Sequence, residues 1–187
     1  ITSDHGEELW EHGEWGHGHS LYEEQVRTPL IFLGPDVAAR AVSQPVSSLH
    51  VTPTLAELAG VPADPSWKGA SLLSALKDPS KPLPKQPCFA RGTLSVPPQE
   101  PAEMVLVGNL KLIRSLVSGR TELYDLAVDP CERADLSESE AESVREMTTL
   151  LDSWRAEHPA TMKDYYGDSE VEDKQQRIQQ LKAIGYL

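Results

Sequence analysis

The stretch Pro29-Leu30-Ile31-Phe32-Leu33-Gly34 is a short apolar run that ends at a glycine. Runs of this length that are apolar at every position are typical of strands buried on both faces of a parallel sheet. Such sheets occur in α/β proteins, where helices cover both faces. The run therefore predicts an α/β fold built around a buried strand at residues 29–34.

Signals for short helices lie on both sides of this run. Ser20-Leu21-Tyr22-Glu23 has the pattern of a capping box and predicts a helix that continues to about Val26. A second helix is expected at residues 53–59, because proline is favoured at the first helical position and Gly60 stands where a residue with positive φ commonly ends a helix. A third is expected at residues 70–76.

The second half of the chain has a different pattern. Residues 78–87 contain four prolines and are interpreted as a linker, so we expect two domains, at residues 1–80 and 81–187. Short segments with strand character follow and predict an antiparallel meander. Apolar spacings of three and four then predict an amphipathic helix, and an acidic-then-basic segment predicts a final one. The expected strands are residues 88–93, 103–107, 111–115 and 122–126, and the expected helices are residues 138–157 and 169–183.

Composition excludes several functional classes. The 187 residues carry 17 Lys and Arg against 29 Asp and Glu, a net charge of −12, which argues against sequence-independent binding of nucleic acid. No apolar run is long enough for a membrane span, and residues 1–4 lack the pattern of a signal peptide, so the cellular compartment is left open. Cys88 and Cys131 form no C-x-x-C pair and are expected to be buried thiols, with a single disulfide left open.

Residues with the potential for metal or acid–base chemistry are concentrated at the start of the chain. Four of the six histidines fall within the first 19 residues, interleaved with glycines. Asp4 and His5 follow a probable strand end, and Gly6 allows a turn that would let both bind one divalent ion. An oxygen and an imidazole together suit Mn²⁺, Zn²⁺ or Fe better than Ca²⁺, which the pattern leaves open.

His17 and His19 form a second element of this candidate site. Either side chain could bind the metal, donate to anionic oxygens or act as a general acid. The sequence does not choose among these roles or between the two residues. His12 is expected on the loop surface, and His50 is expected to be structural.

Several motifs, in the same order along the chain, resemble the C-terminal portion of the sulfatases, a family of the alkaline-phosphatase-like superfamily. They include Thr2-Ser3-Asp4-His5-Gly6, Gly16-His17-Gly18-His19-Ser20-Leu21-Tyr22-Glu23-Glu24, Arg27-Thr28-Pro29-Leu30-Ile31, Val46-Ser47-Ser48-Leu49-His50-Val51-Thr52-Pro53-Thr54-Leu55 and Glu122-Leu123-Tyr124-Asp125-Leu126. The resemblance implies the C-terminal part of an alkaline-phosphatase-like sandwich with a small antiparallel α+β subdomain. It also implies metal-dependent hydrolysis of a small-molecule or glycan sulfate ester.

Site residues carried over from the resemblance are Asp4 and His5 as metal ligands, with His17 or His19 catalytic and in contact with the substrate. The metal would be Ca²⁺, Mn²⁺ or Zn²⁺. His5 stands where many members have Asn, and His17 and His19 stand near a position where many have Lys. These departures keep open a phosphodiesterase, phosphonate hydrolase or phosphoethanolamine-transferase-like activity.

The family's nucleophile, a formylglycine matured from a Cys/Ser-x-Pro/Ala-x-Arg motif, is not found here, since Cys88-Phe89-Ala90-Arg91 does not fit that pattern. In the family this motif lies N-terminal to the position of Asp4. We therefore expect the chain to be the C-terminal part of a longer enzyme, inactive alone, whose partner is the remainder of its own catalytic domain. The alternative from another class is a non-catalytic metal-binding domain.

Overall fold

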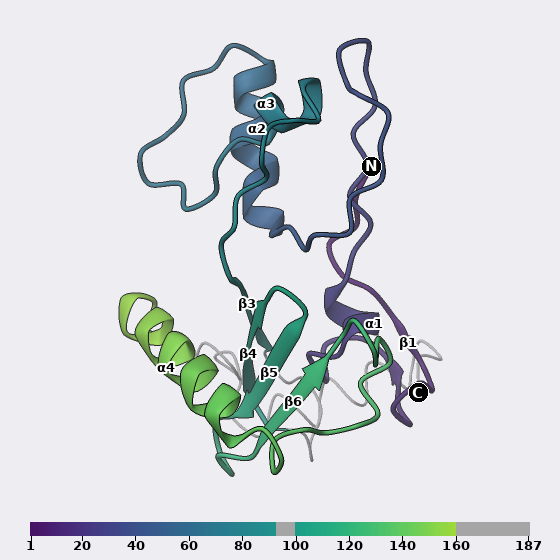
Figure 1. The fold of residues 1–187 in the computed structure, drawn as a ribbon, viewed down its shortest axis with the longest axis vertical. Helices are drawn as coiled ribbons and strands as arrows, with labels where there is room; N and C mark the ends of the chain where they lie inside the picture. The colour runs from purple at the N-terminus through teal and green to yellow at the C-terminus, as the bar shows by residue number, and fades with distance from the viewer. Residues whose placement is uncertain (93–99, 160–187) are drawn as a thin grey trace, which may run out of the picture.

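The fold was analysed in a computed structural model that describes residues 1–92 and 100–159. Figure 1 shows two parts, one with short helices and one with a sheet and a long helix, joined by the proline-rich segment before the sheet. The helix expected at residues 169–183 lies outside the described residues. Among the described helices, none has the length and apolar character needed to cross a membrane.

An antiparallel sheet forms the centre of the C-terminal part, as the strand pattern predicted. Its strand order is the chain order, β3-β4-β5-β6. The bounds are β3 (Cys88–Gly92), β4 (Ala102–Val107), β5 (Leu110–Ser115) and β6 (Thr121–Asp125). Gly108 and Gly119 have φ of +60° and +72° in the two connections that follow β4 and β5, where a left-handed backbone conformation favours glycine.

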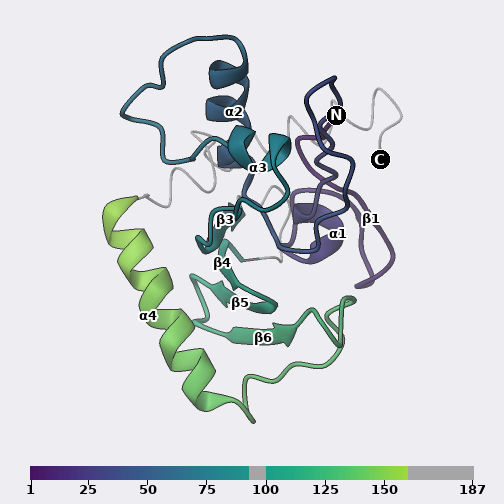
Figure 2. The same cartoon turned by 45° about the horizontal axis from the view of Figure 1, so that its top comes forward.

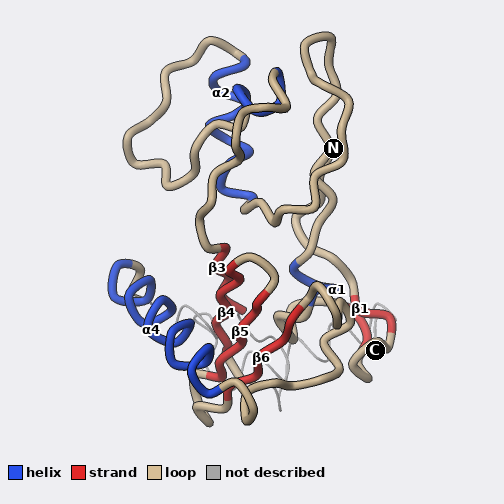
Figure 3. The backbone as a smooth tube through the Cα atoms, viewed as in Figure 1, coloured by secondary structure: helices blue, strands red, loops and turns tan. Residues whose placement is uncertain are grey.

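Both faces of this sheet are covered. Helix α4 (Ala141–Glu157) packs on one face, where Leu112 of β5 and Leu151 of the helix are fully buried in one cluster. On the other face Leu21 packs against Met104 and Ile113. Leu21 belongs to the N-terminal segment, residues 6–26. Figure 3 shows the helix on one side of the strands and the N-terminal segment on the other. The N-terminal segment is thereby fixed to the C-terminal sheet.

The other part of the molecule is built from the 3₁₀ helix η1 (Ser48–His50), helix α2 (Val51–Leu58) and helix α3 (Leu73–Lys77). His50 is buried, and its Nδ1 accepts a hydrogen bond from the Ala70 amide at 2.9 Å, which confirms a structural role. A Cβ atom at Gly69 would lie 1.9 Å from the Leu49 carbonyl oxygen, so only glycine permits this approach. Gly60 has φ of +69° just after α2, as expected.

Two local predictions are wrong. Residues 29–34 form no strand in the described part of the chain and make only an isolated antiparallel bridge, Thr2 with Leu30. A strand needs partners on its edges, and Leu33 is 80% exposed here. The capping box does not form either, because helix α1 (Glu23–Val26) begins after Tyr22 and the Ser20 hydroxyl instead accepts a hydrogen bond from the Gln25 side-chain Nε2.

The two cysteines are not buried as expected. Cys88 is half-buried and Cys131 is exposed, and both are free thiols. Burial, followed by the charge of Glu23, raises the pKa of the Cys88 thiol. Cys88 therefore lacks the low pKa of a reactive thiolate.

Candidate functional site

The histidine-rich loop, residues 6–20, is folded against helix α1. Figures 1 and 2 show α1 beside β1 (Glu8–Leu9), which pairs with β2 (Trp15–Gly16) in a small hairpin. The Gly6 amide donates to the Gln25 carbonyl at 2.9 Å, and a Cβ at Gly6 would lie 2.0 Å from the Glu24 carbonyl oxygen. The loop therefore takes its position from this short helix.

Two buried side chains organise the loop from within. The Glu8 carboxylate accepts hydrogen bonds from the amides of His12 (3.1 Å) and Glu14 (2.8 Å) and from the Gln25 side chain (3.1 Å). The Gln25 side-chain oxygen accepts from the Gly18 amide at 2.9 Å. Burial alone would raise the pKa of Glu8, but hydrogen bonds, the strongest from His19, hold it below its ordinary value. Glu8 is thus a buried anion that fixes both ends of the loop.

Three side chains with ligand atoms meet on the exposed side of this loop. One ligand atom each of His5, Glu7 and His17 lies within 4.8 Å of the others. The rings of His5 and His17 are stacked with centroids 3.9 Å apart, and His17 Nδ1 lies 3.2 Å from Glu7 Oε1. The structure therefore brings His5 and His17 together and adds Glu7.

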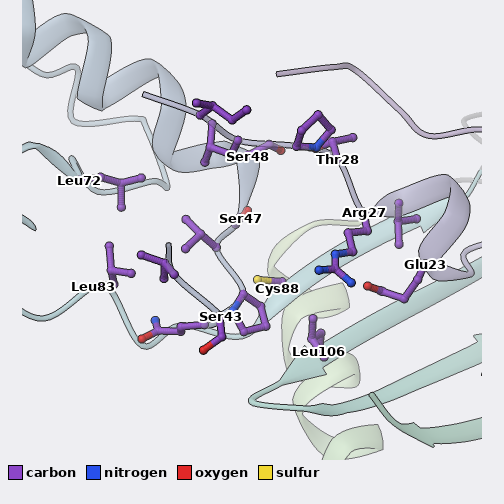
Figure 4. A pocket seen from close by; sticks show the side chains of 18 of the residues that line it. Glu23, Arg27, Thr28, Ser43, Ser47, Ser48, Leu72, Leu83, Cys88 and Leu106 are labelled. Carbon is purple, nitrogen blue, oxygen red and sulfur yellow. The ribbon is translucent and has the colours of Figure 1, made fainter. Parts of the chain in front are cut away.

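Asp4 lies at the edge of this cluster. Its Oδ2 is 3.7 Å from His5 Nε2, and its side chain is 89% exposed. Its own backbone amide, then the His5 ring, lower the pKa of Asp4. Asp4 also lines a cleft of about 1280 Å³ between the two parts of the molecule, with Arg27 and Thr28 on one side and Leu72 and Leu83 across from them (Figure 4).

His19 is separated from the cluster. Its side chain is 8% exposed, and its Nε2 lies 2.7 Å from Glu8 Oε2, inside the loop. His17, two residues earlier, is 49% exposed. The structure thus places the two candidate histidines in different surroundings, one open to a ligand and one bound to a buried carboxylate.

The donor set fits a divalent metal ion with mixed oxygen and nitrogen preference. His5 Nδ1 lies 2.8 Å from the Gly6 carbonyl, so Nδ1–H donates there and Nε2 keeps its lone pair. Metal-binding histidines commonly donate their second ring N–H to such a group. Ligand atoms bonded to one ion lie at most about 4.3 Å apart, so slight rotation of these exposed side chains would suffice. Two imidazoles and a carboxylate suit Zn²⁺ or Mn²⁺ better than Ca²⁺, which takes six to eight oxygens.

His12 is half-buried and not a surface residue, contrary to the expectation. Its Nδ1 lies 2.6 Å from Glu24 Oε1 and its Nε2 lies 3.3 Å from the Glu132 carbonyl, and both partners only accept hydrogen bonds. Its ring stacks on Tyr22 at 3.8 Å. Burial alone would lower the pKa of His12, but the hydrogen bond to Glu24 and further contacts raise it. The structure therefore holds His12 as an imidazolium cation.

This raised pKa predicts that the contribution of His12 to stability depends on pH. The contribution is complete below the unfolded-state pKa of about 6.5 and is lost as the pH rises through the higher folded-state pKa. We expect the melting temperature of His12→Gln to fall below that of the unchanged chain at pH 5.5 and the gap to shrink by pH 9. Thermal melts of both chains across this range measure the gap. A gap that is constant with pH would contradict the assignment.

Glu7 is the candidate ligand that the sequence reasoning missed. Its signal was present, because His5 and Glu7 are two residues apart and such residues share a side of an extended chain. The buried role of Glu8 had no comparable signal, since two adjacent glutamates look equivalent in the sequence.

Comparisons with known proteins place these residues in a known family. Residues 1–61 match the family model described as "Sulfatase". The chain is 31% identical to a choline-sulfatase of Rhizobium meliloti, over 84% of this chain and 30% of the relative. It is 30% identical to arylsulfatase K of Mus musculus, over 73% of this chain and 26% of the relative.

A solved structure with the same fold is a putative sulfatase from Bacteroides thetaiotaomicron. It superimposes with a TM-score of 0.72 at 26% identity, covering 93% of this chain and 39% of that one. The chain thus spans about a third of the length of the relatives it matches. The expected alkaline-phosphatase-like fold with an antiparallel subdomain is confirmed.

Proposed function

Because the chain belongs to the sulfatase family, we propose that it is the C-terminal part of an enzyme that hydrolyses sulfate esters with a divalent metal ion. The observation that carries the proposal is the cluster of His5, Glu7 and His17, which lies within the segment matched by the family model. The family is generally metal-dependent. In this proposal Asp4 and His5 bind the ion, and Zn²⁺ or Mn²⁺ fits their neighbours best.

The chemistry follows from which groups are exposed. The bound ion would stabilise negative charge on the ester oxygens. His17 is half-exposed beside His5, so its ring can reach an anionic group held next to the metal and donate a proton or hydrogen bond to it. Glu7, 3.2 Å from His17 Nδ1, holds the ring through that nitrogen, so Nε2 is the nitrogen that contacts the anionic group in this proposal.

We further propose that the N-terminal part of the chain, residues 1–61, packs against the remainder of its own catalytic domain. Large apolar side chains are exposed along this part, in contrast to the C-terminal sheet, where both faces are covered. They are Ile1, Ile31, Leu33, Val42, Leu49, Leu55, Leu58 and Val61, each at least 46% exposed. All fall in residues 1–61, the segment matched by the family model. Apolar surface of this extent is typical of an interface.

The test compares ester classes in the full-length enzyme. We expect it to release nitrophenol from 4-nitrophenyl sulfate faster than from the matching phosphonate monoester and phosphate diester. A chelator should abolish the activity, and Mn²⁺ or Zn²⁺ should restore it. The 187-residue chain should release no more nitrophenol than its His5→Ala variant.

Each other outcome overturns a stated part of the proposal. Faster cleavage of the phosphonate or phosphate ester would replace sulfate as the substrate class. Metal binding without hydrolysis of any of the three esters would indicate a non-catalytic metal-binding domain. Activity of the 187-residue chain above the His5→Ala control would contradict the need for a partner segment.

A further inference from the structure

A fully buried lysine joins the C-terminal sheet to the loop that carries the candidate site. Lys111 Nζ, in β5, lies 3.0 Å from Glu23 Oε1 and 2.8 Å from Glu132 Oε1. The side chains of Lys111 and Glu132 are both 0% exposed. Charged groups are removed from water at high cost, so this arrangement persists only because each charge has a partner.

Glu132 connects three segments of the chain. Its carboxylate pairs with Lys111 and accepts the Glu23 amide at 2.5 Å, at the first residue of α1. Its carbonyl accepts from His12, which lies 120 residues earlier in the histidine-rich loop. Its φ of +52° is unusual for a residue with a side chain, and in this conformation its carboxylate meets Glu23 while its carbonyl meets His12.

Helix α1 needs such external contacts. It has four residues, and helices this short are not stable by themselves. The loop in turn is held by Gln25 of α1 and by Glu8, as described above. A displacement of α1 would therefore move the whole loop, including Glu7 and His17.

We propose that Lys111 and Glu132 are positioning residues of the candidate site, through which the C-terminal subdomain fixes α1 and the histidine-rich loop. This inference rests on the proposed function for its role in metal binding. Lys111 and Glu132 lie outside the cluster of His5, Glu7 and His17 and act through α1 and through His12 of the loop. Through these two residues the antiparallel subdomain positions a candidate site that lies outside it.

Hydrogen exchange of the loop tests the positioning itself. In the 187-residue chain, Glu132→Gln and Lys111→Met should increase amide exchange at residues 6–20 by at least about tenfold under native conditions. The matched control is Glu103→Gln, a fully buried carboxylate of the same sheet that pairs with Arg91 and Arg114 on the face covered by α4. It should leave exchange in the loop unchanged. Glu132→Gln keeps the size of the side chain and carries the test if Lys111→Met does not fold.

Zinc titration of the same variants measures the effect on the site. We expect the zinc dissociation constant to rise about tenfold in Glu132→Gln and to stay within about twofold in Glu103→Gln. Equal loop exchange in Glu132→Gln and Glu103→Gln would overturn the inference. Absence of zinc binding to the unchanged chain would instead count against the proposed metal site, while the exchange result would still decide the role of Lys111 and Glu132.

Discussion

Replacing Leu151 with alanine is expected to lower the free energy of unfolding by about 3 kcal/mol. Leu151 is fully buried between α4 and the sheet, in one cluster with Val105, Leu112 and Leu123. The substitution removes three carbon atoms from this cluster. The surrounding β-sheet cannot close the resulting cavity, because hydrogen bonds between the strands fix their spacing.

Leu150 supplies the matched control for this prediction. It precedes Leu151 in the same helix but is 39% exposed. Leu150→Ala keeps the helix propensity of the first variant and should cost less than about 1 kcal/mol. Urea denaturation followed by circular dichroism measures both values. Similar losses in the two variants would show that α4 does not pack on the sheet as described.

Sequence patterns predicted this part of the fold well because its contacts are close in the chain. The meander and α4 lie within 70 residues. Successive residues of each strand point to opposite faces of the sheet, so the apolar residues of a strand divide between the two clusters that cover it. Leu150 and Leu151 are both apolar, but adjacent helix positions are 100° apart and only one of the two can face the sheet centre.

The apolar run at residues 29–34 was wrongly predicted to form a strand, because the contacts that decide strand formation need not be close in the chain. Its composition is that of a buried strand, but strand formation depends on neighbours that can come from anywhere in a chain. Among the described residues Thr2 alone bridges to this run. Ile31 and Leu33 are consequently exposed, which agrees with the proposed packing against the remainder of the catalytic domain.

Sequence patterns gathered the candidate residues in the first 19 positions, but the roles within this segment depend on backbone geometry. Gly16 and Gly18, with φ of +96° and +80°, flank His17. These conformations break the alternation of an extended chain, so the spacing of His17 and His19 does not reveal which of them faces outward. Glu7 and Glu8 are adjacent where the chain enters β1, and adjacent residues of an extended chain point to opposite sides, so one side chain is exposed and the other is buried.

The final prediction distinguishes the two histidines by activity and by stability. In the full-length enzyme, His17→Ala should lower kcat/KM for a sulfate ester by about 10²- to 10⁴-fold, the range typical for loss of a general acid. Its melting temperature should change little, because the His17 side chain is 49% exposed and its partner Glu7 is equally exposed. In the 187-residue chain without an ester, where His17 can serve as a third donor to the ion, the same change should weaken zinc binding.

His19→Ala should show the reverse pattern, because His19 pairs with a buried anion. Its removal leaves Glu8 Oε2 without its 2.7 Å partner in a site where the carboxylate is 1% exposed. Gln25 still donates to this oxygen at 3.1 Å, and loss of one hydrogen bond to a charged group costs about 1.5–3 kcal/mol. We therefore expect a clear loss of melting temperature, with zinc affinity reduced less than in His17→Ala when measured well below the melting transition. Kinetics, thermal melts and zinc titration of both variants decide between them. If His19→Ala lost activity at full stability while His17→Ala was nearly unchanged, the two roles would be exchanged. The reacting group would then lie inside the loop, because an exposed ring that can be removed without effect cannot be the one that contacts the ester.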